Sequence, residues 1–249
     1  MELYIIRHGQ SVNNVSMITD GKDRVADPPL TELGQKQADA VAKHLKSGLN
    51  PDTLIDAAYG HGEGKPGFEI TKLYCSPMLR TLQTALPISK ALGLKPEVWI
   101  DIHEHGGLYM DYQDERGVVG FPGLTRAEVI AGFPDYALPD DITDKGWWNP
   151  NQREEDLADA QARAIRVAAT LRKQSKTNTD ERVALVTHGT FADCLLKAFL
   201  YQLPTRQHFF AHYNTGISRV DFVDFDKELH LRLRYTNRVD HLLAEWLSA

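Results

Sequence analysis

The sequence predicts an α/β fold built around a mostly parallel sheet. Two short apolar runs, residues 3–6 and 183–187, are typical of strands buried inside such a sheet. The first run ends in His8-Gly9 and the second in His188-Gly189. Because open α/β sheets bind their ligands at the carboxyl ends of the strands, two adjacent runs would bring both imidazoles to one edge.

Composition restricts the function. The 249 residues allow one large domain or two small ones, and the 42% apolar content is enough for a sizeable core. A net charge of -6 argues against a general nucleic-acid partner, but it leaves room for a locally cationic pocket that binds a small anion. Cys75 and Cys194 are too few for a disulfide framework.

The ends and the apolar runs indicate the compartment. The chain starts with a strand pattern rather than a basic region and a signal core. No apolar run approaches the roughly 20 residues that a membrane-spanning helix needs. We therefore expect a cytoplasmic protein with no membrane partner.

The first half of the chain alternates strand and helix patterns. Thr31 is a good N-cap for a helix that Gly48 ends, and Arg80 falls in the first turn of a second helix. The glycine-rich stretch 60–67 lacks the ending of a phosphate-binding P-loop, so we interpret it as an exposed linker or insertion. The expected elements are a strand at 2–6, a loop at 15–29, a helix at 31–47, a strand at 70–74, a helix at 77–92 and a short strand at 98–100.

Residues 101–150, here called the lid segment, are rich in Gly, Pro and aromatic residues. They contain one clear helix pattern, 125–131, in which Thr125 and Glu128 have capping-box spacing. We interpret this segment as a lid inserted over the site. After it we expect a helix at 152–173, a strand at 183–187, a helix to about 202, antiparallel strands at 216–225 and 228–235, and a turn with a short helix at 237–249.

Four stretches together resemble the histidine phosphatase superfamily, which is also called phosphoglycerate mutase-like. They are Arg7-His8-Gly9, Leu30–Ala38, Leu73–Ala85 with its Ser-Pro turn and arginine-bearing helix, and Thr187-His188-Gly189. The matches follow the family's order from the first strand to beyond residue 200. The resemblance implies one domain over residues 1–249, a three-layer αβα sandwich, and a lid inserted at about 101–150.

The resemblance also assigns His8 as the residue that is phosphorylated. A transferring phosphoryl group carries its charge on three oxygens, so its catalysis is mostly positioning and positive charge. Neighbouring cations would also disfavour protonation of His8 and keep one ring nitrogen free to attack. The expected phosphate-binding residues are Arg7, Ser11, Asn14, Arg80 and Gly189, with His188 as a further catalytic residue.

The leaving alcohol needs a proton. In this family the donor is generally a carboxylic acid soon after the third strand, and Glu104 holds that place. Asp101 is the second candidate. His103 and His105 have metal-ligand spacing, but no third and fourth ligand accompany them. We therefore expect no metal and no other cofactor, as in the family.

Three lid residues are candidates for contacting the substrate. The stretch 123–128 resembles one in phosphoglycerate mutases, with Arg126 in place of their lysine. Trp147 and Trp148 could stack on a substrate or form a small core of the lid itself. The arginine pair that follows in the mutases has no counterpart, and acidic residues prevail between 133 and 148. This pattern favours hydrolysis over transfer between two phosphorylated positions.

We therefore expect a metal-independent phosphomonoesterase that acts through phospho-His8 on a small phosphorylated substrate. One alternative is a bisphosphoglycerate-dependent mutase, whose second basic subsite would come from Arg116, Arg126 or Arg153. The other is a catalytically inactive protein that binds a phosphorylated ligand. The identity of the substrate and the oligomeric state stay open, with a homodimer as one option.

Overall fold

A six-stranded sheet organises the part of the chain described by the computed structural model, residues 1–19, 24–50, 65–152 and 154–249. The spatial order is β3-β2-β6-β1-β7-β8. The strands are β1 (Glu2–Arg7), β2 (Lys72–Cys75), β3 (Glu97–Val98), β6 (Arg182–Thr187), β7 (Ile217–Phe225) and β8 (Glu228–Arg238). The first four strands in this order pair in parallel, β7 pairs antiparallel with β1, and β8 pairs antiparallel with β7.

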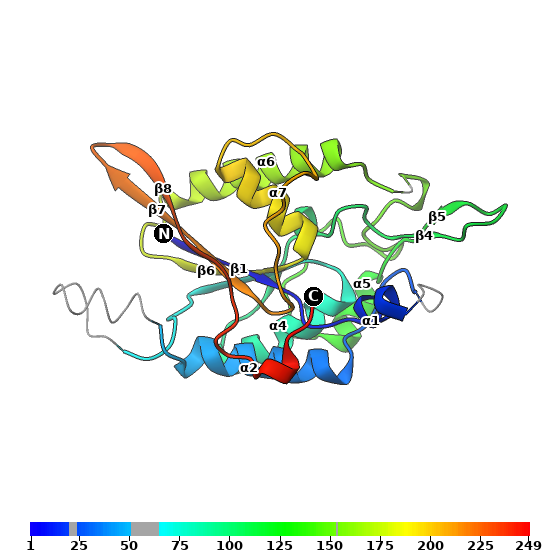
Figure 1. Ribbon diagram of the computed structural model, residues 1–249, viewed down its shortest axis with the longest axis horizontal. Coiled ribbons are helices and arrows are strands. Elements are labelled where there is room, and N and C mark those ends of the chain that lie inside the picture. The colour runs from blue at the N-terminus through cyan, green and yellow to red at the C-terminus, as the bar shows by residue number, and fades with distance from the viewer. Residues whose placement is uncertain (20–23, 51–64, 153) are drawn as a thin grey trace.

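Helices cover both faces of the sheet (Figure 1). On one face lie α2 (Glu32–Ser47) and α4 (Leu79–Leu92), and on the other lie α6 (Leu157–Ser175) and α7 (Gly189–Phe199). Two clusters of buried apolar residues fill the two spaces between sheet and helices. The predicted three-layer α/β fold with a mostly parallel sheet is therefore confirmed.

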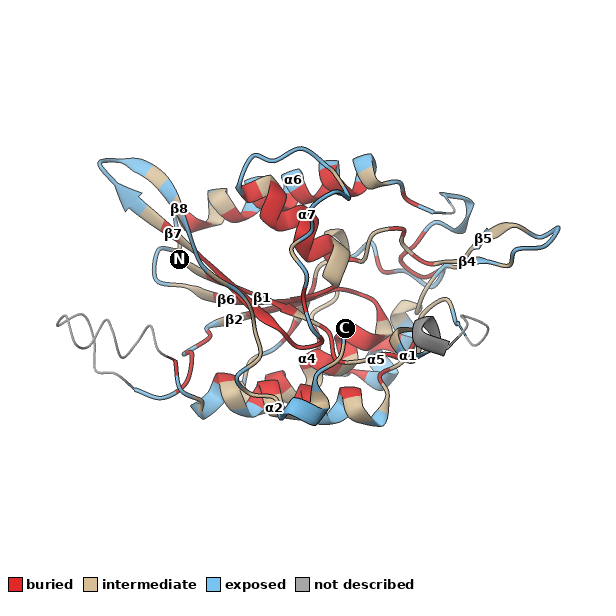
Figure 2. Ribbon diagram, viewed as in Figure 1, coloured by how far each residue is buried: buried red, intermediate tan, exposed pale blue. Residues whose placement is uncertain are grey.

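The central strands are apolar on both sides because both faces of the sheet are covered. Residues 3–6 of β1 are fully buried, as are residues 183–187 of β6 (Figure 2). Leu3 and Ile5 belong to one core cluster, whereas Tyr4 and Ile6 belong to the other. The alternation of side chains along a strand thus links the two cores through β1.

Local sequence signals account for several element ends. The Thr31 side chain caps α2 by accepting from the amide of Gly34. In the lid segment, α5 (Arg126–Gly132) begins with the expected capping box of Thr125 and Glu128. Asp226 and Lys227 both have positive φ, 53° and 65°, which suits the tight turn between β7 and β8.

Several expected boundaries were wrong. The loop expected at 15–29 starts later, because α1 (Val12–Thr19) precedes it and the turn residues of that stretch lie beyond Thr19. The helix expected from Gln152 starts at Leu157, where Asp156 caps it by accepting from the amide of Asp159. The strand expected at 98–100 is only Glu97–Val98, followed by a 3₁₀ helix at Ile100–Ile102.

The lid segment also holds a hairpin that periodicity did not indicate, β4 (Tyr109–Asp111) and β5 (Val118–Gly120), which extends away from the sheet (Figure 1). The glycines at 60–64 lie outside the described residues. Within the described ranges, no helix is both long and apolar enough to cross a membrane.

Candidate active site

The two His-Gly motifs meet at the carboxyl edge of the sheet. β1 and β6 pair in parallel with Arg7 opposite Thr187, and the amide of His8 donates to the carbonyl of Thr187 at 2.9 Å. The next residues in the two strands, His8 and His188, place their ring centroids 5.2 Å apart. Both side chains are buried. The expectation that the two imidazoles meet at one edge is confirmed.

Hydrogen bonds fix the tautomer of His8. Its Nδ1 lies 2.7 Å from the carbonyl oxygen of Gly9. Because a carbonyl can only accept, Nδ1 carries the proton and Nε2 is left with its lone pair. Nε2 accepts from Nε of Arg80 at 3.1 Å. Burial lowers the pKa of His8 well below its usual value, and the charges of Arg80 and Arg7 lower it further. His8 is therefore a neutral imidazole with an unprotonated Nε2.

Two arginines accompany this nitrogen, Arg80 buried and Arg7 partly buried. Arg80 is the second residue of α4, and burial lowers its pKa. Arg7 ends β1 and donates from Nη1 to the carbonyl of His212 at 2.5 Å. Burial lowers the pKa of Arg7 to about 10, so it stays cationic at neutral pH. Its Nε has no hydrogen-bond partner among the described residues, which leaves a buried donor beside His8.

His188 is held by a residue that follows β2, the strand that pairs with β6 on the side away from β1. Its Nε2 lies 2.8 Å from the hydroxyl of Ser76, which follows β2. Its Nδ1 is buried without a hydrogen-bond partner in the described part of the chain. Burial lowers the pKa of His188, with further lowering from Arg80 and from His8. Gly189 follows, and a Cβ there would lie 3.4 Å from Nε of Arg7, so this small residue gives the Arg7 side chain its room.

The carboxylate of Glu104 sits at the N-terminus of α7. Its Oε1 accepts from the amides of Phe191 and of His105 at 2.9 Å each, and its Oε2 accepts from the amide of Thr190 at 3.4 Å. These amides aim the carboxylate into the same cavity as Arg7. Asp101, the second candidate, does not line this cavity, and its carbonyl accepts from Arg163.

Ser11 and Asn14 lie at the start of α1 and bond to each other. The Ser11 amide and hydroxyl both donate to Oδ1 of Asn14, at 2.9 and 3.0 Å. Oδ1 of Asn14 also lies 3.4 Å from Nδ2 of Asn214. Asn214 donates from Nδ2 to the carbonyl of His8 at 3.1 Å. These bonds tie the start of α1 to the backbone of His8.

Most of the expected site residues line one cavity of about 360 Å³, whereas His188 lies behind its lining, next to His8. Its lining combines three arginines with polar and apolar groups. It consists of Arg7, His8, Ser11, Asn13, Asn14, Arg24, Pro28, Arg80, Glu104, Gly189, Thr190, Phe209, Ala211, His212 and Ala249. A small anion therefore meets cations, backbone amides and one carboxylate within a single cavity.

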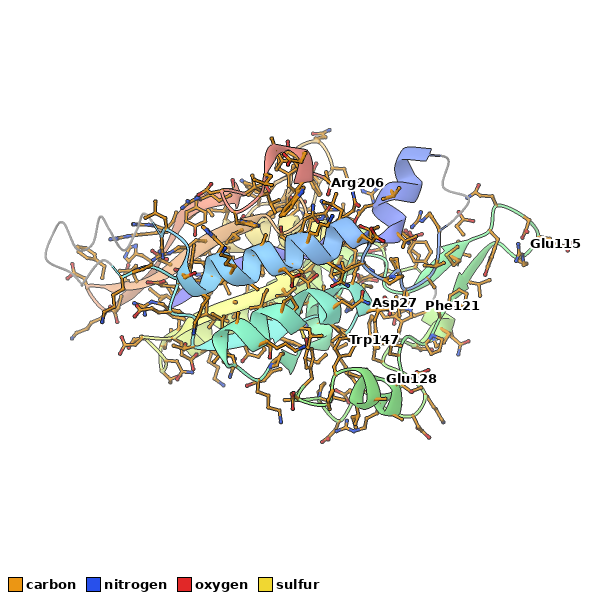
Figure 3. The ribbon with its side chains drawn as sticks, turned by 90° about the horizontal axis from the view of Figure 1, so that it is seen from below. Asp27, Glu115, Phe121, Glu128, Trp147 and Arg206 are labelled. Carbon is orange, nitrogen blue, oxygen red and sulfur yellow. The ribbon has the colours of Figure 1, made fainter. Side chains whose placement is uncertain are left out.

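The three expected lid residues lie elsewhere. Trp147 (labelled in Figure 3) and Trp148 are buried, with ring centroids 5.5 and 5.1 Å from that of His103, and both belong to one of the two core clusters of the protein. Arg126 donates to the carbonyls of Pro139 and Ile142. None of the three lines the cavity. The rings of both tryptophans are used in core packing, and the guanidinium of Arg126 is used in hydrogen bonds to lid carbonyls.

The His-x-His pair does not form a metal centre in the described residues. Nδ1 of His103 donates to the carbonyl of Ile100, and burial lowers its pKa to about 3. No group of three or more candidate ligands gathers anywhere in the described ranges.

Sequence reasoning missed residues that come from distant loops. Asn214 and His212 belong to the segment before β7, to which no motif pointed, and Ser76 was noted only as part of a turn. Arg24, Phe209 and Ala211 also line the cavity without a sequence signal that distinguishes them. Each of these residues reaches the site through the way distant segments fold together, so the residues next to it in the sequence do not reveal its position.

Comparisons with known proteins show the family of the chain. The family described as "Histidine phosphatase superfamily (branch 1)" matches residues 3–233. A PE-PGRS family protein of Mycobacterium tuberculosis is 36% identical over 107 residues, which span 43% of this chain and 15% of that protein. A probable phosphoglycerate mutase GpmB of Yersinia enterocolitica is 25% identical over 222 residues, 89% of this chain and 85% of that protein.

A solved structure shares the fold. The phosphoserine phosphatase of Entamoeba histolytica, in complex with 3-phosphoglyceric acid, superposes with a TM-score of 0.58. The alignment covers 97% of this chain and 99% of that one at 21% sequence identity. At this identity the likeness establishes the arrangement of strands and helices.

Proposed function

The chain belongs to the histidine phosphatase superfamily, and we propose that it is a metal-independent phosphomonoester hydrolase working through a phosphohistidine intermediate on a small phosphorylated substrate. The observation that carries the proposal is the state of His8. Its Nδ1 proton is engaged by the carbonyl of Gly9, and its unprotonated Nε2 accepts from the buried Arg80 in a cavity that Arg7 also lines. A neutral imidazole held this way is a nucleophile aimed at an anion site.

In the first step, Nε2 of His8 attacks the phosphorus atom of the ester. The bond between phosphorus and the ester oxygen breaks, and the proton of Glu104 goes to the leaving alkoxide. Arg7 and Arg80 hold the phosphoryl oxygens and offset the negative charge in the transition state. His188 donates to the same group, and the hydroxyl of Ser76 keeps its ring in place.

In the second step, water attacks the phosphohistidine. Glu104, now ionised, takes a proton from that water, the bond between Nε2 and phosphorus breaks, and phosphate leaves. The carbonyl of Gly9 stays bonded to Nδ1–H through both steps, so the ring does not turn while Nε2 is modified. Glu104 returns to its protonated form and the enzyme is regenerated.

The cavity supports a small substrate. A volume of about 360 Å³, at the small end of ordinary ligand pockets, accommodates a phosphate ester with a short carbon chain. The Entamoeba histolytica phosphatase is in complex with 3-phosphoglyceric acid, a small phosphate ester. Phe209, Ala211 and Pro28 add apolar surface to the lining for the carbon chain.

A mutase is the second candidate, because the GpmB relative is described as a probable phosphoglycerate mutase. Two of the three cations proposed for a second phosphate do not line the cavity. Arg116 pairs with Asp114, and Arg126 binds lid carbonyls. Arg153 lies outside the described residues. Arg24 does line the cavity, so it is the cation through which a mutase would hold a second phosphate.

One assay separates the two candidates. Phosphate release from an aryl phosphate is measured with and without a chelator, beside isomerisation of 3-phosphoglycerate with and without bisphosphoglycerate. We expect chelator-resistant hydrolysis that His8→Ala abolishes, with no isomerisation. Fast isomerisation with weak hydrolysis would replace the phosphatase proposal by the mutase.

A further inference from the structure

A partly buried carboxylate outside the lining of the cavity lies next to Arg80. Asp27 precedes α2 in a loop, and its side chain is 16% exposed. Its Oδ1 lies 3.9 Å from Nη1 of Arg80, which is close enough for charge attraction but too long for a hydrogen bond. Nε of the same guanidinium donates to Nε2 of His8. Asp27 and His8 therefore contact two different nitrogens of one arginine.

The same carboxylate also holds the helix that carries this arginine. Met78, the N-cap of α4, offers no side-chain capping bond. Asp27 supplies that bond from a distant loop, since its two oxygens accept from the Leu79 amide at 3.0 and 3.2 Å. A carboxylate at the start of a helix is also favoured by the helix dipole. Asp27 thus fixes both the backbone just before Arg80 and the guanidinium at the end of its side chain.

The loop that carries Asp27 is fastened to the catalytic loop. The carbonyl of Pro29 accepts from the amide of Val12, and Leu30 donates its amide to Oε1 of Gln83 on α4 at 2.7 Å. Figure 3 shows Asp27 at the end of the layer formed by α2 and α4. The loop therefore spans the gap between the start of α1, next to His8, and the start of α4, next to Arg80. Asp27 and Arg24 are the charged residues in the described part of this loop, residues 24–30, and of the two Asp27 has the charge that attracts Arg80.

We propose that Asp27 is a positioning residue, which sets the guanidinium of Arg80 so that Nε meets His8 and the remaining N–H groups face the bound phosphate. This inference rests on the proposed phosphatase function and adds to it the group that orients its arginine. Burial also raises the pKa of Asp27 to about 6, so the carboxylate is ionised at pH 7 and above and can attract Arg80 there.

The decisive variant is Asp27→Asn. Its amide oxygen can still accept from Leu79, so the cap of α4 is kept while the charge is lost. We expect an unfolding midpoint close to the wild type and a fall in kcat/KM on the order of 10- to 100-fold, which is typical of a displaced catalytic group. Asp39→Asn, on the exposed face of α2, is the matched control and should change neither quantity.

A double-mutant cycle tests whether the effect passes through Arg80. In an Arg80→Gln background the guanidinium is gone, so adding Asp27→Asn should change kcat/KM by less than about twofold.

Inorganic phosphate serves as a second probe by calorimetry, and Asp27→Asn should bind it more weakly than the wild type does. Equal or tighter phosphate binding by Asp27→Asn would overturn the proposal, because removing a negative charge alone would favour an anion.

The outcomes separate this inference from the function on which it rests. If the wild type hydrolyses phosphate esters and Asp27→Asn keeps full activity, Asp27 only caps α4 and the positioning role is wrong. If the same fold loss persists in the Arg80→Gln background, Asp27 acts by another route and the proposal is again wrong. If the wild type forms no phosphohistidine, the proposed function itself fails, whatever Asp27 does to phosphate binding.

Discussion

Replacing Lys197 by Met should destabilise the protein strongly and disturb Arg7. Lys197 lies in α7 and is only 1% exposed. Its ammonium group donates to Oδ2 of Asp193 at 2.6 Å and to the carbonyls of Thr205 and His208 at 2.7 and 2.9 Å. These three bonds use all of its protons. Oδ1 of Asp193 accepts from the amide of Phe210.

The magnitude follows from what the substitution leaves behind. Asp193 is 1% exposed, so Lys197→Met leaves a buried carboxylate without its cation, which costs about 3–5 kcal/mol. The carbonyls of Thr205 and His208 lie in a largely exposed segment, so water replaces most of what they lose. The carboxylate therefore dominates the loss.

A second variant isolates the charge. Asp193→Asn combined with Lys197→Met removes both charges and keeps an oxygen for Phe210, so the double variant should recover at least 1 kcal/mol over Lys197→Met alone. The assay is urea unfolding followed by tryptophan fluorescence, read as the midpoint and slope. Lys173→Met, at an exposed site on α6, is the control and should stay within about 0.5 kcal/mol of the wild type.

The catalytic consequence is specific. Residues 205–210 lead directly to His212, whose carbonyl accepts from Arg7. Folded Lys197→Met should therefore bind inorganic phosphate more weakly than the wild type. A loss below 1 kcal/mol in Lys197→Met, or a double variant no more stable than the single one, would refute the reasoning.

Three further predictions concern the catalytic loop, pH and the lid segment. Gly34→Ala should lower the free energy of unfolding by about 1–3 kcal/mol and reduce activity, because its Cβ would lie 2.1 Å from the carbonyl oxygen of Gln10, two residues after His8. Gly132→Ala, where an added Cβ has no neighbouring atom within 4 Å, is the control in the same unfolding assay. The free energy of unfolding should fall as pH drops from 6.5 to 5, since buried histidines stay neutral in the folded state and bind protons only when unfolded. His103 alone, with a pKa lowered to about 3, contributes about 2 kcal/mol of that fall. A free energy of unfolding that does not change over this pH range would contradict the prediction. Arg126→Met should leave KM for a small phosphate ester unchanged while lowering the thermal midpoint, because Arg126 binds lid carbonyls outside the cavity; a large rise in KM would instead place Arg126 on the substrate.

The sequence was sufficient for the part of the site that depends on strand ends. Arg7, His8 and His188 end parallel strands, so a fixed local pattern determines where they point. Arg80 and Glu104 follow the same logic, since each lies just after a strand or at the start of a helix at the same edge. The sheet determines where these residues lie, and short sequence motifs are therefore enough to predict their positions.

The remainder of the site depends on contacts between distant segments. Asn214 reaches the carbonyl of His8 across 206 positions, and Asp27 reaches Leu79 across 52. Neither residue carries a local signal that distinguishes it from a surface Asn or Asp. Trp147 looked like a substrate-stacking group because aromatic residues serve binding and packing alike, and only the neighbouring His103 and Trp148 show that it is buried in the lid segment.

The account depends most directly on Nε2 of His8 as the nucleophile. The measurement that tests it is acid-free quenching of the wild type during turnover of a radiolabelled phosphate ester, followed by mapping of the labelled peptide. Label on the peptide containing His8, absent in His8→Ala and released on a chase with unlabelled substrate, is the predicted result. Label that survives His8→Ala, or turnover by the wild type with no labelled histidine at all, would contradict the account.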